Sequence, residues 1–314
     1  MVSIANAEIE SEIGMGAQYR IDNLDWNIAG GPNGESPNVL SELQWRDIKS
    51  YQVTYTAKVN LDRGFYFTAD IAKGFIFDGK NQDSDWALDD RNAEFSRSNN
   101  NASDGDTSDF SFGLGWTFNF GRPNSAKNFR LAPLIGMSKH RQLFTMTDGV
   151  QTVSDLENWQ ILNPGATGVP PLGPFDGLNS TYEAQWKGVW LGLDTTYFFT
   201  NTQRLNVNVR YHRADYEGEG NWNLRSDFQH PVSFIHETDA QGVALTLGWT
   251  MHLNKAWRLH FDYQYQQWTS DAGLDRVFFS NNTYAETRFN EVNWDSSAIG
   301  VYFTYYINKE VESH

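Results

Sequence analysis

The sequence lacks cysteine altogether, and it lacks any apolar run long enough to cross a membrane as a helix. Without cysteine there is no disulfide framework, which suits a chain that crosses an oxidising periplasm, although cytosolic proteins also lack cysteine. A transmembrane helix needs about 18 consecutive apolar residues, so a helical span is excluded. A transmembrane β-barrel is not excluded, because the hydrophobic signal of each of its strands is weak.

Positive charge is also scarce, because 24 Lys and Arg stand against 39 Asp and Glu, for a formal net charge of -15. This balance argues against nucleic acid as a partner and favours cations or basic peptides. Residues 1–8 lack the basic and apolar segments of a signal peptide, so we expect that an exported form has already lost it. The H-E-x-x-H, G-x-S-x-G and P-loop patterns are missing, and the sequence predicts no resident metal or cofactor.

Aromatic residues are abundant, at 15% of a chain whose mean hydropathy is only -0.57. Residues 257–268 show how many aromatic residues and a low mean hydropathy occur together. Apolar and polar side chains alternate there, as in a strand with one apolar and one polar face. The apolar positions are Trp257, Leu259, Phe261, Tyr263 and Tyr265, and the polar ones are Arg258, His260, Asp262, Gln264 and Gln266. The same alternation in the neighbouring strands predicts a polar lumen that includes Arg210, His212, Arg258, His260 and Asp262.

Similar alternating segments predict about ten strands, which begin near residues 8, 39, 65, 110, 129, 186, 205, 233, 257 and 288. Long loops are expected at 22–38, 80–107, 148–180 and 270–286, and they alternate with short turns. Pro133 cannot donate a hydrogen bond to a neighbouring strand, so we expect a β-bulge in its strand.

This pattern predicts an all-β fold, a ten-stranded antiparallel transmembrane β-barrel in a Gram-negative outer membrane, as a single domain over residues 1–314. We expect extracellular long loops, periplasmic short turns and termini, and a monomer. A soluble up-and-down barrel is the alternative, but it would place its apolar face inside. Most strands exceed the roughly 9 to 11 residues that span lipid, so the barrel should project above the membrane and carry its site at the upper rim.

Asp83 and Asp85 are candidate chemical groups, because they lie two residues apart beyond the third strand and can share a proton or a water. The alternative is a solvated acidic loop that binds Ca²⁺ together with Asp78.

Ser41-Glu42-Leu43-Gln44-Trp45, Asp83-Ser84-Asp85-Trp86 and Ser96-Arg97 resemble landmarks of the omptins, ten-stranded outer-membrane endopeptidases. The resemblance implies that an Asp pair faces an Asp–His pair across the barrel mouth, and together they activate a water. Asp83 and Asp85 match the first pair, whereas Asn221 and Asn223 stand where the Asp and His are expected. Asparagine cannot act as a general base. His140, His212 and His236 are possible replacements, or else ordinary polar residues of the lumen.

The same resemblance implies a lipopolysaccharide site of basic residues on the outer wall. Lys139, Arg141 and Lys187 fit it, whereas Gln185 stands in place of an expected Arg. The alternative is ordinary basic residues at the membrane border.

Glu94-Phe95-Ser96-Arg97-Ser98 and Asn221-Trp222-Asn223-Leu224-Arg225 resemble a second group, the Protochlamydia outer membrane proteins, to which porin activity is attributed. We therefore expect an omptin-like barrel that does not hydrolyse peptides. It would act as a small cation-preferring pore or as a surface-exposed binding barrel with an acidic mouth. The alternative is an outer-membrane endopeptidase that cleaves at basic residues.

Overall fold

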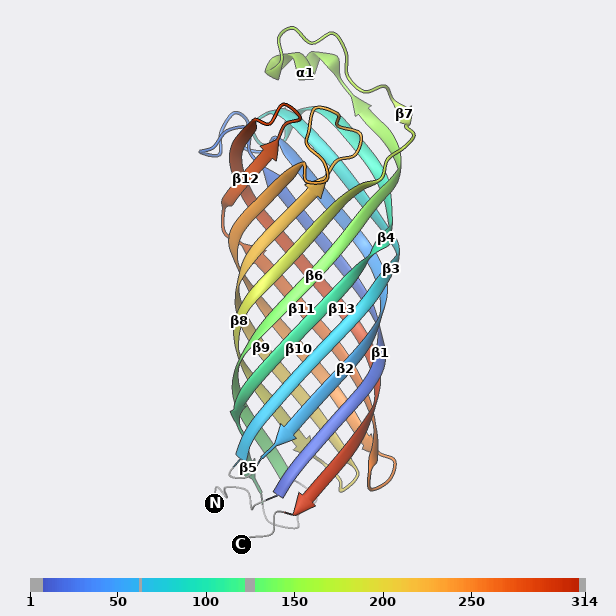
Figure 1. The fold of residues 1–314 in the computed structure, drawn as a ribbon, viewed down its shortest axis with the longest axis vertical. Helices are drawn as coiled ribbons and strands as arrows, with labels where there is room; N and C mark the ends of the chain where they lie inside the picture. Colours follow the sequence, from blue (N-terminus) through green and yellow to red (C-terminus); the bar gives the residue numbers. More distant parts are fainter. Residues whose placement is uncertain (1–7, 62–63, 122–127, 311–314) are drawn as a thin grey trace.

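The computed structural model describes residues 8–61, 64–121 and 128–310, which form a tall antiparallel β-barrel with both chain ends at one end (Figure 1). Within these residues ten long strands follow one another around the ring, and β1 pairs with β13 to close it. The strands are β1 (Glu8–Ile28), β2 (Ser41–Asn60), β3 (Phe65–Leu88), β4 (Asn92–Trp116), β6 (Asn128–Ser154), β8 (Ser180–Phe198), β9 (Gln203–Asn221), β10 (Phe234–His252), β11 (Trp257–Ser270) and β13 (Tyr284–Glu310). The predicted ten-stranded fold is confirmed.

The loop prediction is wrong for three of the four long segments, because much of each segment is strand or helix. The stretch 80–107 continues β3 and β4 into a hairpin, and cross-strand hydrogen bonds such as Gln82 Nε2 to Asn99 Oδ1, 2.9 Å, hold it together. In 148–180, β6 continues and is followed by α1 (Leu156–Leu162) and β7 (Gly173–Pro174). In 270–286, β12 (Gly273–Phe278) pairs with β13. Above a membrane neither strand face meets lipid, so the alternation that marks a strand disappears.

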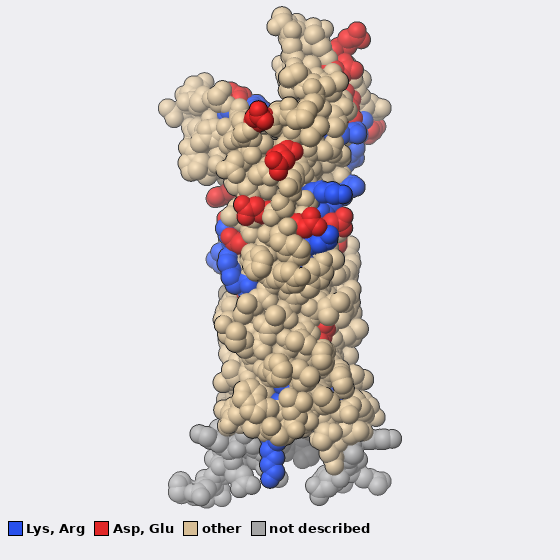
Figure 2. Space-filling view, turned by 90° about the vertical axis from the view of Figure 1, so that its right-hand side faces the viewer, with Lys and Arg blue, Asp and Glu red and all other residues tan. Residues whose placement is uncertain are grey.

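The outer wall of the lower barrel is apolar. Exposed side chains there include Ile13, Ile71, Ile135, Leu191 and Ile299, each at least half accessible. On the face shown in Figure 2, Lys, Arg, Asp and Glu gather on the upper part, and the wall below carries almost none. A large exposed apolar belt is unfavourable in water and favourable against lipid tails. No helix in the described ranges is both long and apolar enough to span a membrane.

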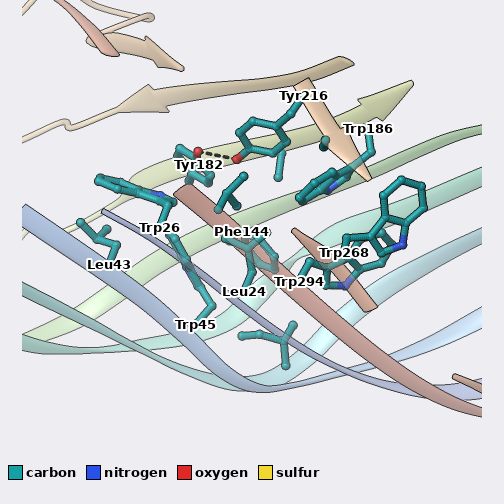
Figure 3. Packing of buried hydrophobic residues seen from close by; sticks show 14 of the residues in the cluster. Leu24, Trp26, Leu43, Trp45, Phe144, Tyr182, Trp186, Tyr216, Trp268 and Trp294 are labelled. Carbon is teal, nitrogen blue, oxygen red and sulfur yellow. Dashed lines mark hydrogen bonds between the residues drawn. The ribbon is translucent and has the colours of Figure 1, made fainter. Parts of the chain in front are cut away.

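The inside of the upper barrel is filled by a cluster of 20 buried hydrophobic residues, which we call the aromatic cluster (Figure 3). The predicted polar lumen residues lie below this cluster. The cluster is built around Leu24, Trp26, Leu43, Trp45, Phe144, Tyr182, Trp186, Tyr216, Phe234, Trp268, Phe289 and Trp294. Where strands rise above lipid, apolar side chains are best buried inside, as in soluble barrels.

Candidate functional site

The barrel mouth holds Asp83 and Asp85 side by side on the inner face of β3. Asp83 lies opposite Leu43 of β2 and Ser98 of β4, and Asp85 lies opposite Ser41 and Ser96 of the same strands. Directly opposed residues of antiparallel strands project to the same face, so Ser41 on one side and Ser96 and Ser98 on the other share the inner surface with the aspartates. The predicted juxtaposition of the pair at the rim is what the structure shows.

Burial controls the charge of this pair. Removal from water raises the pKa of Asp85 to about 6, against the hydrogen bonds that Ser41 and Ser96 offer to its ionised form. Burial and the neighbouring Asp85 charge raise the pKa of Asp83 well above its ordinary value. Two buried carboxyl groups this close do not both ionise easily, so the pair retains a proton near neutral pH.

The opposite side of the mouth supplies an indole and a guanidinium. Trp222 and Arg225 both act on Asp83 and favour its ionised form, the indole by a hydrogen bond and Arg225 by its charge. Arg225 is also held by Asp227, with Nε to Oδ1 at 2.9 Å and Nη2 to Oδ2 at 2.8 Å, and it stacks on Phe228. Sequence reasoning had placed neither Trp222 nor Arg225 in the site. A signal was present, because these residues and Ser96 belong to the two five-residue motifs singled out above.

Asn221 and Asn223 have partners other than the Asp pair. Asn221 Oδ1 lies 2.7 Å from His230 Nδ1. Asn223 Oδ1 accepts from the Asn179 amide at 2.9 Å and from the Ser180 hydroxyl at 3.0 Å, so this side chain anchors the loop before β8.

The inward positions at this end of β9 are Gly218 and Gly220. Aromatic rings occupy the space beside them, because a Cβ there would lie 2.3 Å from the Tyr182 hydroxyl and 2.1 Å from the Phe234 ring. Within the described residues, β9 therefore presents glycine and aromatic surface to the mouth, and no general base.

None of the three histidines considered as replacements joins the pair. His236 is fully buried between Trp26 and Phe289, with Nε2 3.2 Å from Asp275 Oδ1 and Nδ1 2.9 Å from the Tyr182 hydroxyl. Burial lowers the pKa of His236, against the effect of Asp275.

The other two histidines lie on the inside below the aromatic cluster. His140 Nδ1 is 2.8 Å from Asp109 Oδ1, and His212 Nδ1 is 3.1 Å from Ser138 Oγ. Both rings contact Trp268.

The predicted lumen residues lie inside the barrel and are joined by ion pairs that the sequence did not reveal. Arg210 packs over Trp190 and reaches Asp70, with Nη2 to Oδ2 at 3.4 Å. Arg258 pairs with Glu12, which also binds Arg204, Nη2 to Oε2, at 2.6 Å. His260 Nδ1 is 2.7 Å from Thr250 Oγ1, and Asp262 Oδ2 accepts from Gln264 Nε2 at 3.2 Å.

The basic residues proposed to bind lipopolysaccharide divide into two kinds. Lys139 and Lys187 are exposed and lie directly opposite each other on β6 and β8. Arg141 is occupied by two carboxylates, with Nη1 2.7 Å from Asp106 Oδ1 and Nη2 2.6 Å from Glu183 Oε2. Lys187 also lies opposite Asp215 of β9, and the two lysines are the exposed charges of this cluster.

The three aspartates considered for calcium, Asp78, Asp83 and Asp85, do not lie on one face of β3. Asp78 is exposed and pairs with Lys49, Nζ to Oδ2, at 2.6 Å, whereas the other two aspartates face inward. The described ranges contain no group of three or more His, Cys, Asp or Glu side chains that could hold a metal ion.

The sequence profile of one protein family, described as Protochlamydia outer membrane protein, matches residues 13–307. The chain belongs to this family. The resemblance noted for the two five-residue motifs is thereby confirmed, and the chain, as a member of this family, is an outer-membrane barrel. No curated protein matches the chain.

Among solved structures, the barrel of this family member is similar to the outer membrane protease OmpT from Escherichia coli. The TM-score is 0.70 at 13% identity, over 98% of each chain. This similarity shows a shared fold and nothing about activity. Two weaker matches have TM-scores well below that of OmpT. They are the Pseudomonas putida toluene transporter TodX (0.29, 10% identity, 99% of this chain and 92% of that chain) and the Pseudomonas aeruginosa outer membrane protein OprG (0.28, 10% identity, 95% of each).

Proposed function

We propose that this protein is a non-proteolytic, monomeric binding barrel whose acidic mouth lies at the cell surface and takes up cationic groups, with its termini in the periplasm. One observation carries the proposal: Asp83 and Asp85 face an indole, a guanidinium and aromatic surface instead of a general base. The water activation that the omptin resemblance implies needs a base on the opposite wall, and the inward positions of β9 in the described structure offer none. A buried pair that shares one proton and lies beside Trp222 suits an ammonium or guanidinium group of a ligand.

The interior favours a binding barrel over a pore. The aromatic cluster occupies the cross-section below the mouth, so an ion would have to pass through packed hydrophobic side chains. The polar lumen beneath it is lined by four acidic and four basic residues, which gives no preference for cations. Any preference for cations therefore belongs to the mouth.

Peptide cleavage tests the proposal. Refolded protein with lipopolysaccharide is incubated with a fluorogenic dibasic peptide, and we expect no cleavage but measurable binding by fluorescence anisotropy. Asp83→Ala should weaken binding at least about tenfold, whereas Asp176→Ala, in an exposed loop, should not. Cleavage that disappears in Asp83→Ala would overturn the non-proteolytic assignment.

The alternative, an endopeptidase for basic peptides, draws on the buried Asp275–His236 pair, which resembles a base with its orienting carboxylate. His236 Nδ1 is hydrogen-bonded to the Tyr182 hydroxyl, Nε2 faces Asp275, and aromatic rings enclose the imidazole, so the aromatic cluster would have to open before it could act. Cleavage abolished by His236→Gln would favour this alternative.

Lys139 and Lys187 are proposed to contact a lipid phosphate at the membrane border. Lipopolysaccharide should raise the unfolding temperature of the wild type, and the Lys139→Ala/Lys187→Ala double variant should lose most of that rise. Lys255→Ala, in the short turn before β11, is the matched control. An unchanged rise in the double variant would refute the contact.

A further inference from the structure

A polar cavity of about 180 Å³ lies inside the barrel below the aromatic cluster, and the proposed function makes no use of it. Its upper lining includes His140 and His212, whose rings contact Trp268 of the cluster. A second, smaller cavity shares Glu12, Lys58, Arg204, Asn206 and Asn208 with it and extends to Glu10, Asn60 and Arg130. These residues lie near the barrel end that carries the termini. The cavity is thus roofed by hydrophobic side chains and continues toward the terminal end.

Side chains around this cavity have polar atoms without a hydrogen-bond partner in the described protein. Five such residues are at least nine-tenths buried, namely Thr54, His140, Arg204, Asp262 and Thr304. Arg210 adds an unpartnered Nε. Buried polar groups are nearly always hydrogen-bonded, so this lining is suited to an occupant that both donates and accepts hydrogen bonds.

The unpartnered atoms that belong to charged side chains are of two opposite kinds. Asp262 Oδ1 would accept a hydrogen bond from a cationic donor, whereas the Nε–H groups of Arg204 and Arg210 would donate hydrogen bonds to an anionic acceptor. The cavity lining as a whole is balanced, with Glu12, Asp70, Asp109 and Asp262 against Arg20, Lys58, Arg204 and Arg210. A ligand of one charge would satisfy one kind of atom and leave the other unpaired, whereas a zwitterion would satisfy both.

The size of the cavity limits the ligand. An engineered cavity of about 150 Å³ in another protein binds benzene, which has about as many heavy atoms as alanine. We propose that the lumen cavity binds a zwitterionic solute of amino-acid size, which reaches it from the barrel end that carries the termini. This site goes beyond the proposed function, because no residue of the mouth takes part in it.

Ligand binding is tested with L-alanine, acetate, methylammonium and glycerol at equal concentrations. Isothermal titration calorimetry on the refolded full-length protein should show binding of L-alanine and at least tenfold weaker binding of the other three. Asp262→Asn should weaken alanine binding at least tenfold, and the exposed Asp176→Asn should leave it unchanged. Equal binding of all four probes, binding of glycerol alone, or no binding at all would overturn the proposal.

A second variant keeps the test valid if Asp262→Asn does not fold. Ala244→Leu narrows the cavity without removing a polar group, since Ala244 lies in its lining, and it should abolish alanine binding in a folded barrel.

The absence of native cysteine also allows a direct measurement of access to the cavity. Thr246→Cys, also in the lining, should react faster with a small thiosulfonate in spheroplasts than in intact cells, and alanine should slow this reaction. Faster reaction in intact cells, or no protection by alanine, would refute the site.

Discussion

At the residue scale, Asp83 and Asp85 show how burial changes the charge state of a side chain. An unfolded aspartate ionises near pH 3.9, whereas folded Asp85 ionises near pH 6 because burial penalises its charge. Between these values the folded protein holds a proton that the unfolded chain has released. The contribution of Asp85 to stability is therefore lost as pH rises from about 4 to about 6, and the loss of this contribution is complete above pH 6.

Removing one carboxylate should remove most of this pH dependence. Asp85→Asn is expected to stabilise the barrel above pH 6, by up to ~3 kcal/mol, and to have little effect at pH 4. Thermal unfolding in detergent micelles between pH 4 and pH 8 measures this, with Asp176→Asn as the control. A difference from wild type that stays constant across this range would contradict the assignment.

A second prediction concerns the hydroxyl of Tyr182, which lies 2.6 Å from that of Tyr216 and 2.9 Å from His236 Nδ1. Tyr182→Phe leaves two buried polar groups without this partner and should cost about 1 to 3 kcal/mol. Tyr211→Phe removes one exposed hydrogen bond to Gln241 and should cost less than about 0.5 kcal/mol. Equal denaturant midpoints for the two variants would show that the buried network contributes nothing.

Alternation alone would turn Asp83 and Asp85 outward, because inward Tyr66 has the opposite parity, and the register shift of β3 near Asp78 reverses this. For Asn221, by contrast, alternation is unbroken along β9. Counting by twos from inward His212 leads to Gly218 and Gly220, so the odd-numbered Asn221 has the outward parity. The partners across the mouth were not predictable, because Trp222 and Arg225 follow the end of β9 and no periodicity extends to them.

At the scale of the elements, inward glycines receive aromatic rings from neighbouring strands. Trp190 lies against Gly113 and Gly136, and Trp268 lies against Gly242. Alternation predicts which residues point inward, but it does not show which ring fills which gap. That pairing depends on the register between strands, which is fixed only when the barrel closes.

A methyl group at one of these glycines should disturb the packing. In Gly242→Ala the new Cβ would lie 2.3 Å from the Trp268 ring, so we expect a loss of about 1 to 3 kcal/mol. Gly165→Ala is the control, because nothing lies within 4 Å of that position. Urea unfolding midpoints of the refolded barrels provide the measurement. Identical midpoints would mean that the ring moves aside without cost.

Pro133 did not produce the predicted bulge in β6, whose pairing with β8 keeps its register throughout. The neighbouring strand breaks instead. β4 ends at Trp116 and β5 (Phe118–Phe120) resumes the pairing with β6 after Thr117. Proline has no N–H to donate, and the sequence alone does not tell which neighbouring strand loses the hydrogen bond.

At the scale of the whole molecule, the aromatic cluster divides the barrel into an acidic mouth and a charge-balanced lumen. We expect wild-type protein in planar bilayers to show no steady conductance, since packed aromatic side chains admit no hydrated ion. Replacing Trp186, Trp268 and Trp294 together with alanine should create measurable ion currents. Conductance of the wild type equal to that of the triple variant would show that ions bypass the cluster.

The buried tryptophans also make the intrinsic fluorescence of the protein a measure of its folding. Trp45, Trp186, Trp190, Trp268 and Trp294 are fully buried and come from β2, β8, β11 and β13, so they meet only when distant parts of the chain have joined. Their fluorescence should shift to shorter wavelength at barrel closure rather than at first contact with a detergent or lipid surface. Closure could thus be timed in the unmodified chain.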